Sequence, residues 1–480
     1  MNRFLGNIIK TFSSNVVSLL TGILVGFFIP KMMGIIGYAN YKIYTLYLTY
    51  LALTSLGLGD GLYLRYAGKE KENIDKETIR YYTQRYYIQI LGFFLLGIVA
   101  TFLFIPLEYR FIAVALCFTI LSSQTVGLHQ NFSMLTSRFG EYSKRIVIKS
   151  AFTALFVIGL YVYYQITGED VRYEIYIIGV LVIEYALAIW YIFTYKDFNF
   201  GKVKIQYNQD RYYRILLVGF PLLLSNMAGS IFMNLDRQFV SILFPKEIYG
   251  MYAFAYNMFT LVTTMTSAVS LVLFPSMRRI ENFDVKEYMQ KYLSLFSIVV
   301  VFCMVVYYPL SVIVTLFLDK YIASIEILRI ILPGLVLSSC VTVIFLNFYK
   351  MENKVKQYFI KTMVSIAVSA GMNYLAWVIF HDYKAISWAS IISLMFWYGL
   401  TIEYFVRVYK VRIIRNSMYV LTMFLTFYTL TYFIHNPYIG TLVYLALFTV
   451  VVVIFYPEKV NEGSGVVRRI VSQRKDNNNV

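Results

Sequence analysis

Long apolar stretches, separated by short polar segments, recur along the whole 480-residue chain. A helix of roughly 20 mostly apolar residues is long enough to cross the hydrocarbon core of a bilayer, so this pattern predicts a polytopic membrane protein. Hydrophobic residues make up 59% of the chain and charged residues only 14%, whereas soluble globular proteins carry about 25% charged residues. Much of the surface is therefore expected to face lipid.

About fourteen segments are long and apolar enough to span, which predicts an all-α integral membrane fold. The third and fourth spans are separated by Pro106 to Tyr109, and the last two by His435 to Pro437. The predicted spans are residues 8–30, 39–63, 86–106, 110–130, 146–165, 174–194, 212–244, 248–276, 292–318, 325–348, 358–380, 385–406, 416–434 and 438–456.

Basic residues are concentrated in every second gap between spans, as in the cluster at residues 69–85 and again at 138–149. Most of the 43 Lys and Arg residues lie on the same side as the N-terminus. The positive-inside rule then predicts a cytoplasmic-membrane protein with both termini in the cytoplasm. The formal net charge of +17 is spread over short loops rather than gathered on one surface, which argues against nucleic acid as a partner.

Part of the sequence repeats after about 215 residues. Phe28-Ile29-Pro30-Lys31 matches Leu243-Phe244-Pro245-Lys246, and each is followed by a glycine with small and aromatic residues. The copies are six predicted spans apart, so the two halves have the same orientation in the membrane. We expect two parallel-repeat six-helix bundles, residues 1–200 and 201–410, around a central cleft. Two additional helices (411–456) and a basic cytoplasmic tail (457–480) follow.

Several short motifs resemble those of the polysaccharide and O-antigen flippases of the multidrug/oligosaccharidyl-lipid/polysaccharide exporter (MOP) superfamily. They are Gly219-Phe220-Pro221, Asp236-Arg237 and Gly250-Met251-Tyr252 in the second half, and Ser55-Leu56-Gly57-Leu58-Gly59 with Leu64-Arg65-Tyr66 in the first. The resemblance extends over about residues 5–456. It implies a fourteen-helix transporter that moves undecaprenyl-diphosphate-linked oligosaccharide across the cytoplasmic membrane by alternating access, for surface polysaccharide biosynthesis.

Two other function classes compete with a flippase. A multidrug or organic-cation antiporter of the same superfamily is the alternative, but no acid precedes Asp60 and the candidate cleft residues are basic. A membrane enzyme is disfavoured because no outer loop is long enough for a catalytic domain. The scattered His and Cys residues predict neither a metal site nor a disulfide framework, and no cofactor is expected. The expected partners are the lipid-linked glycan and the bilayer, with glycan polymerases or glycosyltransferases as candidate protein partners.

Charged residues inside apolar spans are costly and usually face a cavity or a partner. Asp236 and Arg237 lie within span seven, where Arg237 suits a diphosphate or an acidic sugar, or where the two residues hold the span to a neighbour. Lys42 either joins Arg237 in the cleft or snorkels to the outer interface. Arg145 and Lys149 share a helix face and form either a diphosphate-docking patch or ordinary cytoplasmic anchors.

Other candidate residues are polar or conformational. Glu184, in the middle of span six, is expected either to bind a coupling ion or to pair with a buried base. Tyr41 and Tyr44 belong to a tyrosine row that could stack on sugars or simply reflect aromatic bias. Asn257 begins a polar face on span eight that either lines the cleft or serves helix packing. Pro221 is the candidate hinge, because a proline interrupts the helical hydrogen-bond ladder.

Overall fold

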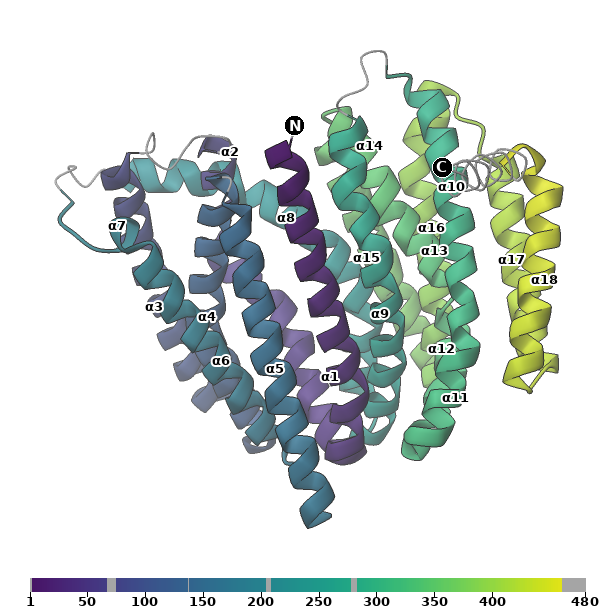
Figure 1. Cartoon of the computed structure of the whole chain (residues 1–480), viewed down its shortest axis with the longest axis horizontal. Coiled ribbons are helices and arrows are strands. Elements are labelled where there is room, and N and C mark those ends of the chain that lie inside the picture. Colours follow the sequence, from purple (N-terminus) through teal and green to yellow (C-terminus); the bar gives the residue numbers. More distant parts are fainter. Residues whose placement is uncertain (1, 67–74, 137, 204–208, 278–282, 460–480) are drawn as a thin grey trace, which may run out of the picture. The chain divides into compact units, whose positions relative to one another are not determined.

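The computed structural model describes residues 2–66, 75–136, 138–203, 209–277 and 283–459, and within these ranges the chain is almost entirely helical, without a strand (Figure 1). Eleven helical segments among the described residues are long and apolar enough to cross a membrane. The all-α, multi-span prediction is therefore confirmed. The eleven segments are Ser13–Ser55, Lys76–Phe104, Leu107–Met134, Gly140–Thr167, Tyr173–Thr194, Arg211–Leu243, Val285–Phe317, Gly334–Met351, Val355–Phe380, Tyr383–Tyr409 and Pro437–Phe455.

The two predicted breaks at residues 106–109 and 435–437 are present. Helix α3 (Lys76–Phe104) ends before Pro106, and α4 (Leu107–Leu135) begins directly after that proline. Helix α17 (Ile414–Phe433) is followed by Asn436, whose side chain accepts hydrogen bonds from two backbone N–H groups of α18 (Pro437–Phe455). These breaks form where local chemistry favours them, because proline starts a helix well and asparagine caps one.

The break between the first two predicted spans is present, but it is shorter than predicted. Helix α1 (Asn2–Leu48) consists of two helical segments that meet at a kink at Gly34, whose backbone is at φ 65° and ψ 175°, inside the predicted connection at residues 31–38. Glycine adopts a positive φ without steric cost, so this single residue provides the turn between the two spans. The second span then continues as η1 (Thr49–Ser55) and, after Leu56 and Gly57, as α2 (Leu58–Tyr66).

The other elements follow the predicted spans closely. Span ten contains a π-helical turn (Cys340–Phe345, η5). The remaining helices are α5 (Phe139–Thr167), α6 (Tyr173–Thr194), α7 (Lys196–Asn199), α8 (Gln209–Leu243), α9 (Lys246–Met277), α10 (Val285–Cys303), η3 (Met304–Val306), α11 (Tyr307–Phe317), η4 (Asp319–Tyr321), α12 (Ala323–Ile331), α13 (Gly334–Ser339), α14 (Leu346–Met351), α15 (Val355–Phe380) and α16 (Tyr383–Tyr409).

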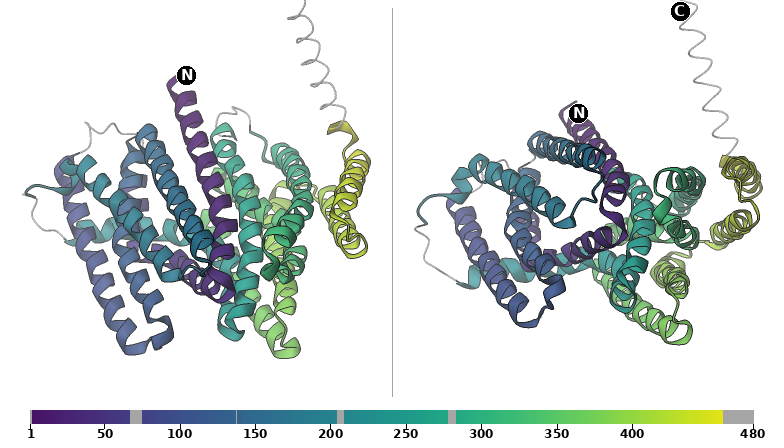
Figure 2. Two further views of the ribbon diagram at one scale, coloured as in Figure 1. Left: turned by 60° about the horizontal axis from the view of Figure 1, so that its bottom comes forward. Right: turned by 90° about the horizontal axis from the view of Figure 1, so that it is seen from below.

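The chain forms two compact units. Unit 1 comprises residues 1–261 and 356–386, and unit 2 comprises residues 262–355 and 387–480. In unit 1, α1 packs along α5, α3 pairs with α4, and α2 lies against α8 (Figures 1 and 2). Apolar and aromatic residues such as Leu58, Tyr82 and Phe132 form a buried cluster that joins α2, α3 and α4.

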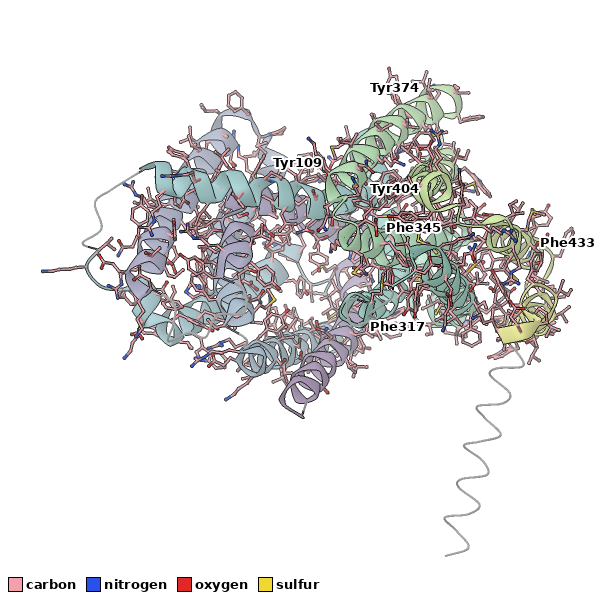
Figure 3. The ribbon with its side chains drawn as sticks, turned by 90° about the horizontal axis from the view of Figure 1, so that it is seen from above. Tyr109, Phe317, Phe345, Tyr374, Tyr404 and Phe433 are labelled. Atoms are coloured by element: carbon pink, nitrogen blue, oxygen red, sulfur yellow. The ribbon has the colours of Figure 1, made fainter. Side chains whose placement is uncertain are left out.

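In unit 2, α17 and α18 lie side by side, and α10 packs against α17 (Figure 2). Phe345 is fully buried in this unit, whereas Phe433 points outward and is 71% exposed (Figure 3). Many other large apolar side chains are exposed as well, as expected for helices that face lipid. The grouping into residues 1–200, 201–410 and 411–456 stays a prediction.

Candidate functional site

Lys42 lies on α1 and directs its ammonium group into unit 1. Its Nζ donates a hydrogen bond to Oδ1 of Asn257 at 3.0 Å and lies 5.2 Å and 5.4 Å from the ring centres of Tyr38 and Tyr41. Among the described residues no carboxylate lies within ion-pair distance of Lys42. The snorkelling alternative does not fit this head group, because it is held by an amide and two aromatic faces.

Asn257 connects α9 to α1 at two points. Besides accepting from Lys42, it donates from Nδ2 to the carbonyl oxygen of Gly26 at 3.3 Å. A Cβ on Gly26 would lie only 2.7 Å from that nitrogen, so a larger residue here would require the Asn257 side chain to shift. Lys42 and Asn257 are 215 residues apart, the same separation as Pro30 and Pro245. The bond therefore joins two residues at the spacing of the predicted repeat.

Asp236 is buried on α8, directly beside Arg237. Its carboxylate accepts hydrogen bonds from the hydroxyls of Tyr252, at 3.0 Å, and Tyr256, and from the backbone N–H of Arg237 at 2.7 Å. It is only 4% exposed. The two tyrosines are four residues apart on one face of α9, so Asp236 holds α8 against α9.

Arg237 keeps its positive charge without a carboxylate partner in the described part of the chain. Its Nη2 donates to the carbonyl oxygen of Met233 at 3.0 Å, and its guanidinium lies 4.8 Å from the ring centre of Tyr256. Its Nε is buried without a hydrogen-bond acceptor. Lys42 lies close enough for the two positive charges to repel each other. Both groups can donate hydrogen bonds to an anion such as a phosphate.

Glu184 on α6 forms an ion pair with Lys149 on α5. Of the two roles expected for Glu184, the structure contains the pairing with a base. The side chain of Glu184 is 12% exposed and that of Lys149 is 38% exposed. Nearby, the hydroxyl of Tyr44 is hydrogen-bonded to that of Thr119 at 2.8 Å. This region is therefore balanced in charge.

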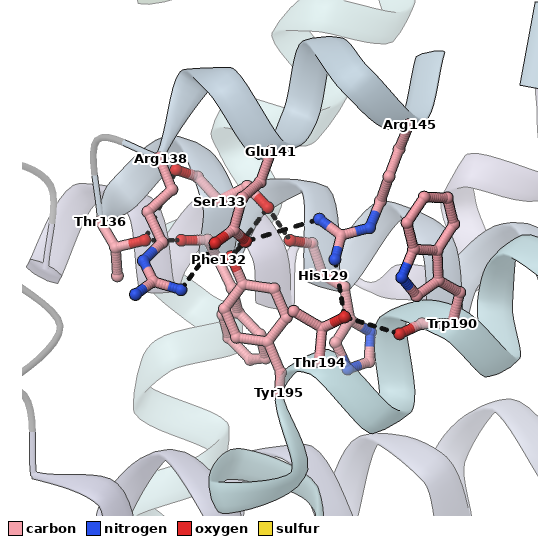
Figure 4. Close-up of polar contacts among 10 residues, drawn as sticks. All are labelled: His129, Phe132, Ser133, Thr136, Arg138, Glu141, Arg145, Trp190, Thr194 and Tyr195. Carbon is pink, nitrogen blue, oxygen red and sulfur yellow. Dashed lines mark hydrogen bonds and ion pairs between the residues drawn. The ribbon is translucent and has the colours of Figure 1, made fainter. Parts of the chain in front are cut away.

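Arg145 also connects α5 to α6, and Figure 4 shows its guanidinium directed toward α6. Its Nη2 donates to Oγ1 of Thr194 at 2.7 Å, and its Nη1 lies 3.5 Å from Glu141. The guanidinium is 5.0 Å from the ring centre of Trp190 and 4.3 Å from that of Tyr191. Because Arg145 is only 4% exposed, these contacts leave it little surface for a ligand.

Glu141 extends the Arg145 contacts into a network at the start of α5 (Figure 4). It pairs with Arg138 at 2.8 Å and accepts from the Tyr195 hydroxyl at 3.5 Å. Burial raises the pKa of the Tyr195 phenol, so this hydroxyl stays neutral; it also bonds Ser133 at 2.9 Å. The network ties α4, α5 and the end of α6 together, which is a structural role.

The family model of polysaccharide biosynthesis proteins matches residues 4–281, more than half of the chain. The chain belongs to this family. No curated protein matches it in sequence. Among solved structures, the lipid II flippase MurJ in an inward closed conformation superimposes with a TM-score of 0.71 at 16% identity, covering 95% of this chain and 100% of that one.

A second solved structure extends the comparison within the MOP superfamily. The inward-facing conformation of a multidrug resistance MATE family transporter superimposes with a TM-score of 0.59 at 15% identity, covering 87% of this chain and 98% of that one. At these identities the likeness concerns the fold. This polysaccharide biosynthesis family member is thus a multi-pass membrane protein with the MOP transporter fold.

Two motifs of this family member that are far apart in the sequence meet in unit 1. A Cβ on Gly219, in α8, would lie 2.0 Å from the carbonyl oxygen of Gly57, and Gly57 itself is at φ 80°. Both glycines are therefore needed for the contact of α2 with α8, two residues before Pro221. Sequence reasoning missed this contact and the tyrosine partners of Asp236. The four-residue spacing of Tyr252 and Tyr256 was the available signal for the latter.

Proposed function

We propose that this protein is a flippase that translocates undecaprenyl-diphosphate-linked oligosaccharide across the cytoplasmic membrane for surface polysaccharide biosynthesis. The observation that supports it most directly is the pair of interior bases, Lys42 and Arg237, that have no carboxylate partner among the described residues. An unbalanced charge inside a membrane segment is costly. An anionic ligand would remove that cost, and a diphosphate provides the charge and the acceptors.

In this proposal, Lys42 and Arg237 bind the diphosphate, and each supplies a different donor geometry. The ammonium is a compact point charge, whereas the guanidinium offers a planar set of N–H groups that can engage two phosphate oxygens. Asn257 and Asp236 act through these bases: Asn257 orients Lys42, and Asp236 fixes the helix that bears Arg237. Tyr41 lies beside Lys42 and offers a ring face to the first sugar.

Transport would follow alternating access, with the two six-helix bundles (residues 1–200 and 201–410) moving about a central cleft and Pro221 as a hinge. Both termini would lie in the cytoplasm. The protein would act as a transporter rather than an enzyme, beside the glycosyltransferases and the polymerase that make and consume its cargo. An organic-cation antiporter of the same fold is the competing assignment, and the uncompensated bases disfavour a cationic cargo.

The test is transport by the purified protein in liposomes. We expect it to move a fluorescent undecaprenyl-diphosphate oligosaccharide to the opposite leaflet and not to move an organic-cation dye. The variant Arg237→Gln keeps the side chain's polarity but removes its charge. Because a hydrogen bond to a charged group contributes about 1.5–3 kcal/mol, the variant should reduce glycan-lipid transport by roughly tenfold or more.

Two results would reject the proposal. One is transport of the organic cation without transport of the glycan lipid. The other is unchanged glycan-lipid transport in Arg237→Gln. Lys144→Gln is the matched control, because Lys144 is an exposed base on α5, and its transport should equal that of the wild type.

A further inference from the structure

A cavity of about 290 Å³ lies in unit 1 among α1, η1, α2, α3 and α4, and neither Lys42 nor Arg237 lines it. Its volume is close to the lower limit of ligand pockets, which enclose about 300–1,000 Å³. Part of the lining is apolar, as at Leu48, Leu51 and Leu128. The polar lining side chains are those of Ser55, Asp60, Tyr86, Ser123, Gln124 and Asn131. The cavity therefore suits a small molecule that has both polar and apolar surface.

Small residues leave the space that forms this cavity. Ala52, Gly59 and Gly127 belong to its lining. A Cβ on Gly127 would have no atom within 4 Å, so the side chain that is missing from this position of α4 leaves open space. A Cβ on Gly59 would instead lie 2.1 Å from Nδ2 of Asn131. The glycine at residue 59 therefore lets the Asn131 amide approach α2 beside Asp60.

Several hydrogen-bonding groups of the lining have capacity to spare. Gln124 is engaged, because it donates to a backbone carbonyl oxygen at 2.8 Å and accepts from the hydroxyl of Tyr86 at 2.8 Å. Among the described residues, the side chains of Asn131 and Ser123 make no hydrogen bond. The Asp60 carboxylate accepts a hydrogen bond from its own backbone N–H in the first turn of α2, and a carboxylate has about four acceptor sites. Donors and acceptors thus remain for a ligand.

The charge of the lining discriminates among polar ligands. Asp60 is the one acid among the lining residues, and no Lys or Arg lines the cavity. A phosphate or a uronic acid would be repelled by Asp60 without a base to compensate. The region around Lys42 and Arg237 is the opposite, because its bases form no ion pair in the described part of the chain. An uncharged ligand rich in hydroxyl groups fits the cavity.

We propose that this cavity binds one uncharged pyranose ring of the transported glycan, a sugar beyond the one joined to the diphosphate. Pyranose hydroxyls both donate and accept hydrogen bonds, which matches the carboxylate of Asp60, the amide of Asn131 and the hydroxyl of Ser123. The C–H groups of the ring would contact the apolar part of the lining. The proposal rests on the flippase function above and adds which part of the glycan is recognised.

The position of the cavity relative to Lys42 determines which sugar it can hold. Leu48, in the cavity wall, is six residues after Lys42 on α1, which is about 9 Å further along the helix axis. Tyr41, beside Lys42, is the candidate contact of the first sugar. A ring in the cavity therefore lies further from the diphosphate than the first sugar does.

The first test measures the affinity of the purified protein for three synthetic geranyl-diphosphate probes. They carry N-acetylglucosamine alone, N-acetylglucosamine with two glucose residues, or N-acetylglucosamine with two glucuronic acid residues. The wild type should bind the glucose probe several-fold more tightly than either of the others. Asp60→Asn removes the negative charge, so it should narrow the difference between the glucose and glucuronate probes. Equal affinity of the wild type for all three probes would overturn the proposal.

Two variants change the cavity itself. Gly127→Leu places a side chain in the open space and should weaken binding of the glucose probe roughly tenfold, to the affinity of the monosaccharide probe. Gly159→Leu is the matched control, because Gly159 is an exposed helical glycine of α5 where a Cβ also has no atom within 4 Å. Both variants should bind the monosaccharide probe as the wild type does. Binding of the glucose probe by Gly127→Leu at wild-type affinity would contradict the proposal.

Asn131→Leu nearly keeps the shape of the side chain and removes its hydrogen bonds. It should weaken binding of the glucose probe by roughly fivefold, as the loss of about one hydrogen bond predicts. Gln130→Leu removes the neighbouring amide, which does not line the cavity, and should have no effect. If Asn131→Leu and Gln130→Leu bind the glucose probe equally well, Asn131 does not contact the sugar and the proposed site is wrong.

A last measurement separates this cavity from the diphosphate site. The free trisaccharide of the glucose probe, without lipid or diphosphate, should raise the thermal unfolding midpoint of the wild type at millimolar concentration. It should not stabilise Gly127→Leu. If the free trisaccharide stabilises the wild type but the glycan lipid is not flipped, the proposed function fails and the sugar site stands. If the glycan lipid is flipped but the free trisaccharide stabilises neither protein, the sugar site fails and the proposed function stands.

Discussion

Two basic regions of unit 1 differ in how their charges are compensated. On α5, Lys149 pairs with Glu184, and the guanidinium of Arg145 is enclosed by Glu141, Thr194 and two aromatic rings. Lys42 and Arg237 instead contact an amide, a backbone carbonyl and tyrosine rings. Each guanidinium has a buried nitrogen without a hydrogen-bond partner, so the two regions differ in their ion pairs. The first contains carboxylate partners, whereas Lys42 and Arg237 form no ion pair among the described residues.

The comparison teaches that depth in a span does not by itself identify a binding residue. Arg145 is buried more completely than Lys42, yet its contacts are those of a structural clamp. The two regions differ in the contacts of their carboxylates. Glu141 of α5 and Glu184 of α6 pair with bases, whereas Asp236, beside Arg237, accepts hydrogen bonds from two tyrosine hydroxyls. Substitutions in the first region should therefore affect folding, and those in the second should affect transport.

The largest effect is expected for Arg145→Met. Methionine fills part of the space but leaves Thr194 and Glu141 without their donor and removes the contact with two aromatic rings. We expect the stability of the folded protein to fall by about 2 kcal/mol, seen as a lower yield of folded protein and a lower midpoint in thermal unfolding in detergent. Lys144→Met, one residue away and exposed, should have no effect. If Arg145→Met is as stable as the wild type, Arg145 does not stabilise the contact between α5 and α6.

The next effect is expected for Lys42→Met, which leaves the apolar stem and removes the charge. The transport rate of glycan lipid should fall about tenfold, equivalent to about 1.4 kcal/mol, because one donor to the diphosphate is lost. The stability of the folded protein should be unchanged or slightly increased, because the variant removes a charge that has no ion-pair partner among the described residues. Lys246→Met provides the control: this lysine pairs with Glu108, and its loss should leave transport intact. The reverse pattern, lost stability with normal transport, would make Lys42 structural.

Local signals in the sequence were sufficient for most of the fold. Every predicted span lies mostly on helical residues, because a span depends on a continuous apolar run and its ends depend on nearby residues such as Pro106 and Asn436. The break between the first two spans was predicted at the right place, residues 31–38, but as a connection of several residues rather than a kink at Gly34. The surrounding residues are apolar either as a helix or as a buried loop, and nothing local shows that one glycine provides the whole turn.

The candidate site was predicted residue by residue but not as a set of contacts. Arg237 and Glu184 were recognisable because a charge interrupts an apolar run. Their partners were not recognisable, because Tyr256 and Lys149 lie on other helices and the pairing depends on how the helices are rotated against each other. The contact of Gly57 with Gly219 has the same origin.

The smallest effect is expected at the Lys149–Glu184 pair, and it separates ion pairing from ion coupling. Glu184→Gln leaves Lys149 without its counter-charge, and because that lysine is 38% exposed the loss of stability should be only about 1 kcal/mol. In the double variant with Lys149→Gln, the two amides can hydrogen-bond each other, so stability should return most of the way to the wild type. A structural pair predicts this rescue for transport as well as for unfolding. If the double variant folds normally yet transports glycan lipid more slowly than the wild type, Glu184 takes part in transport beyond its ion pair with Lys149.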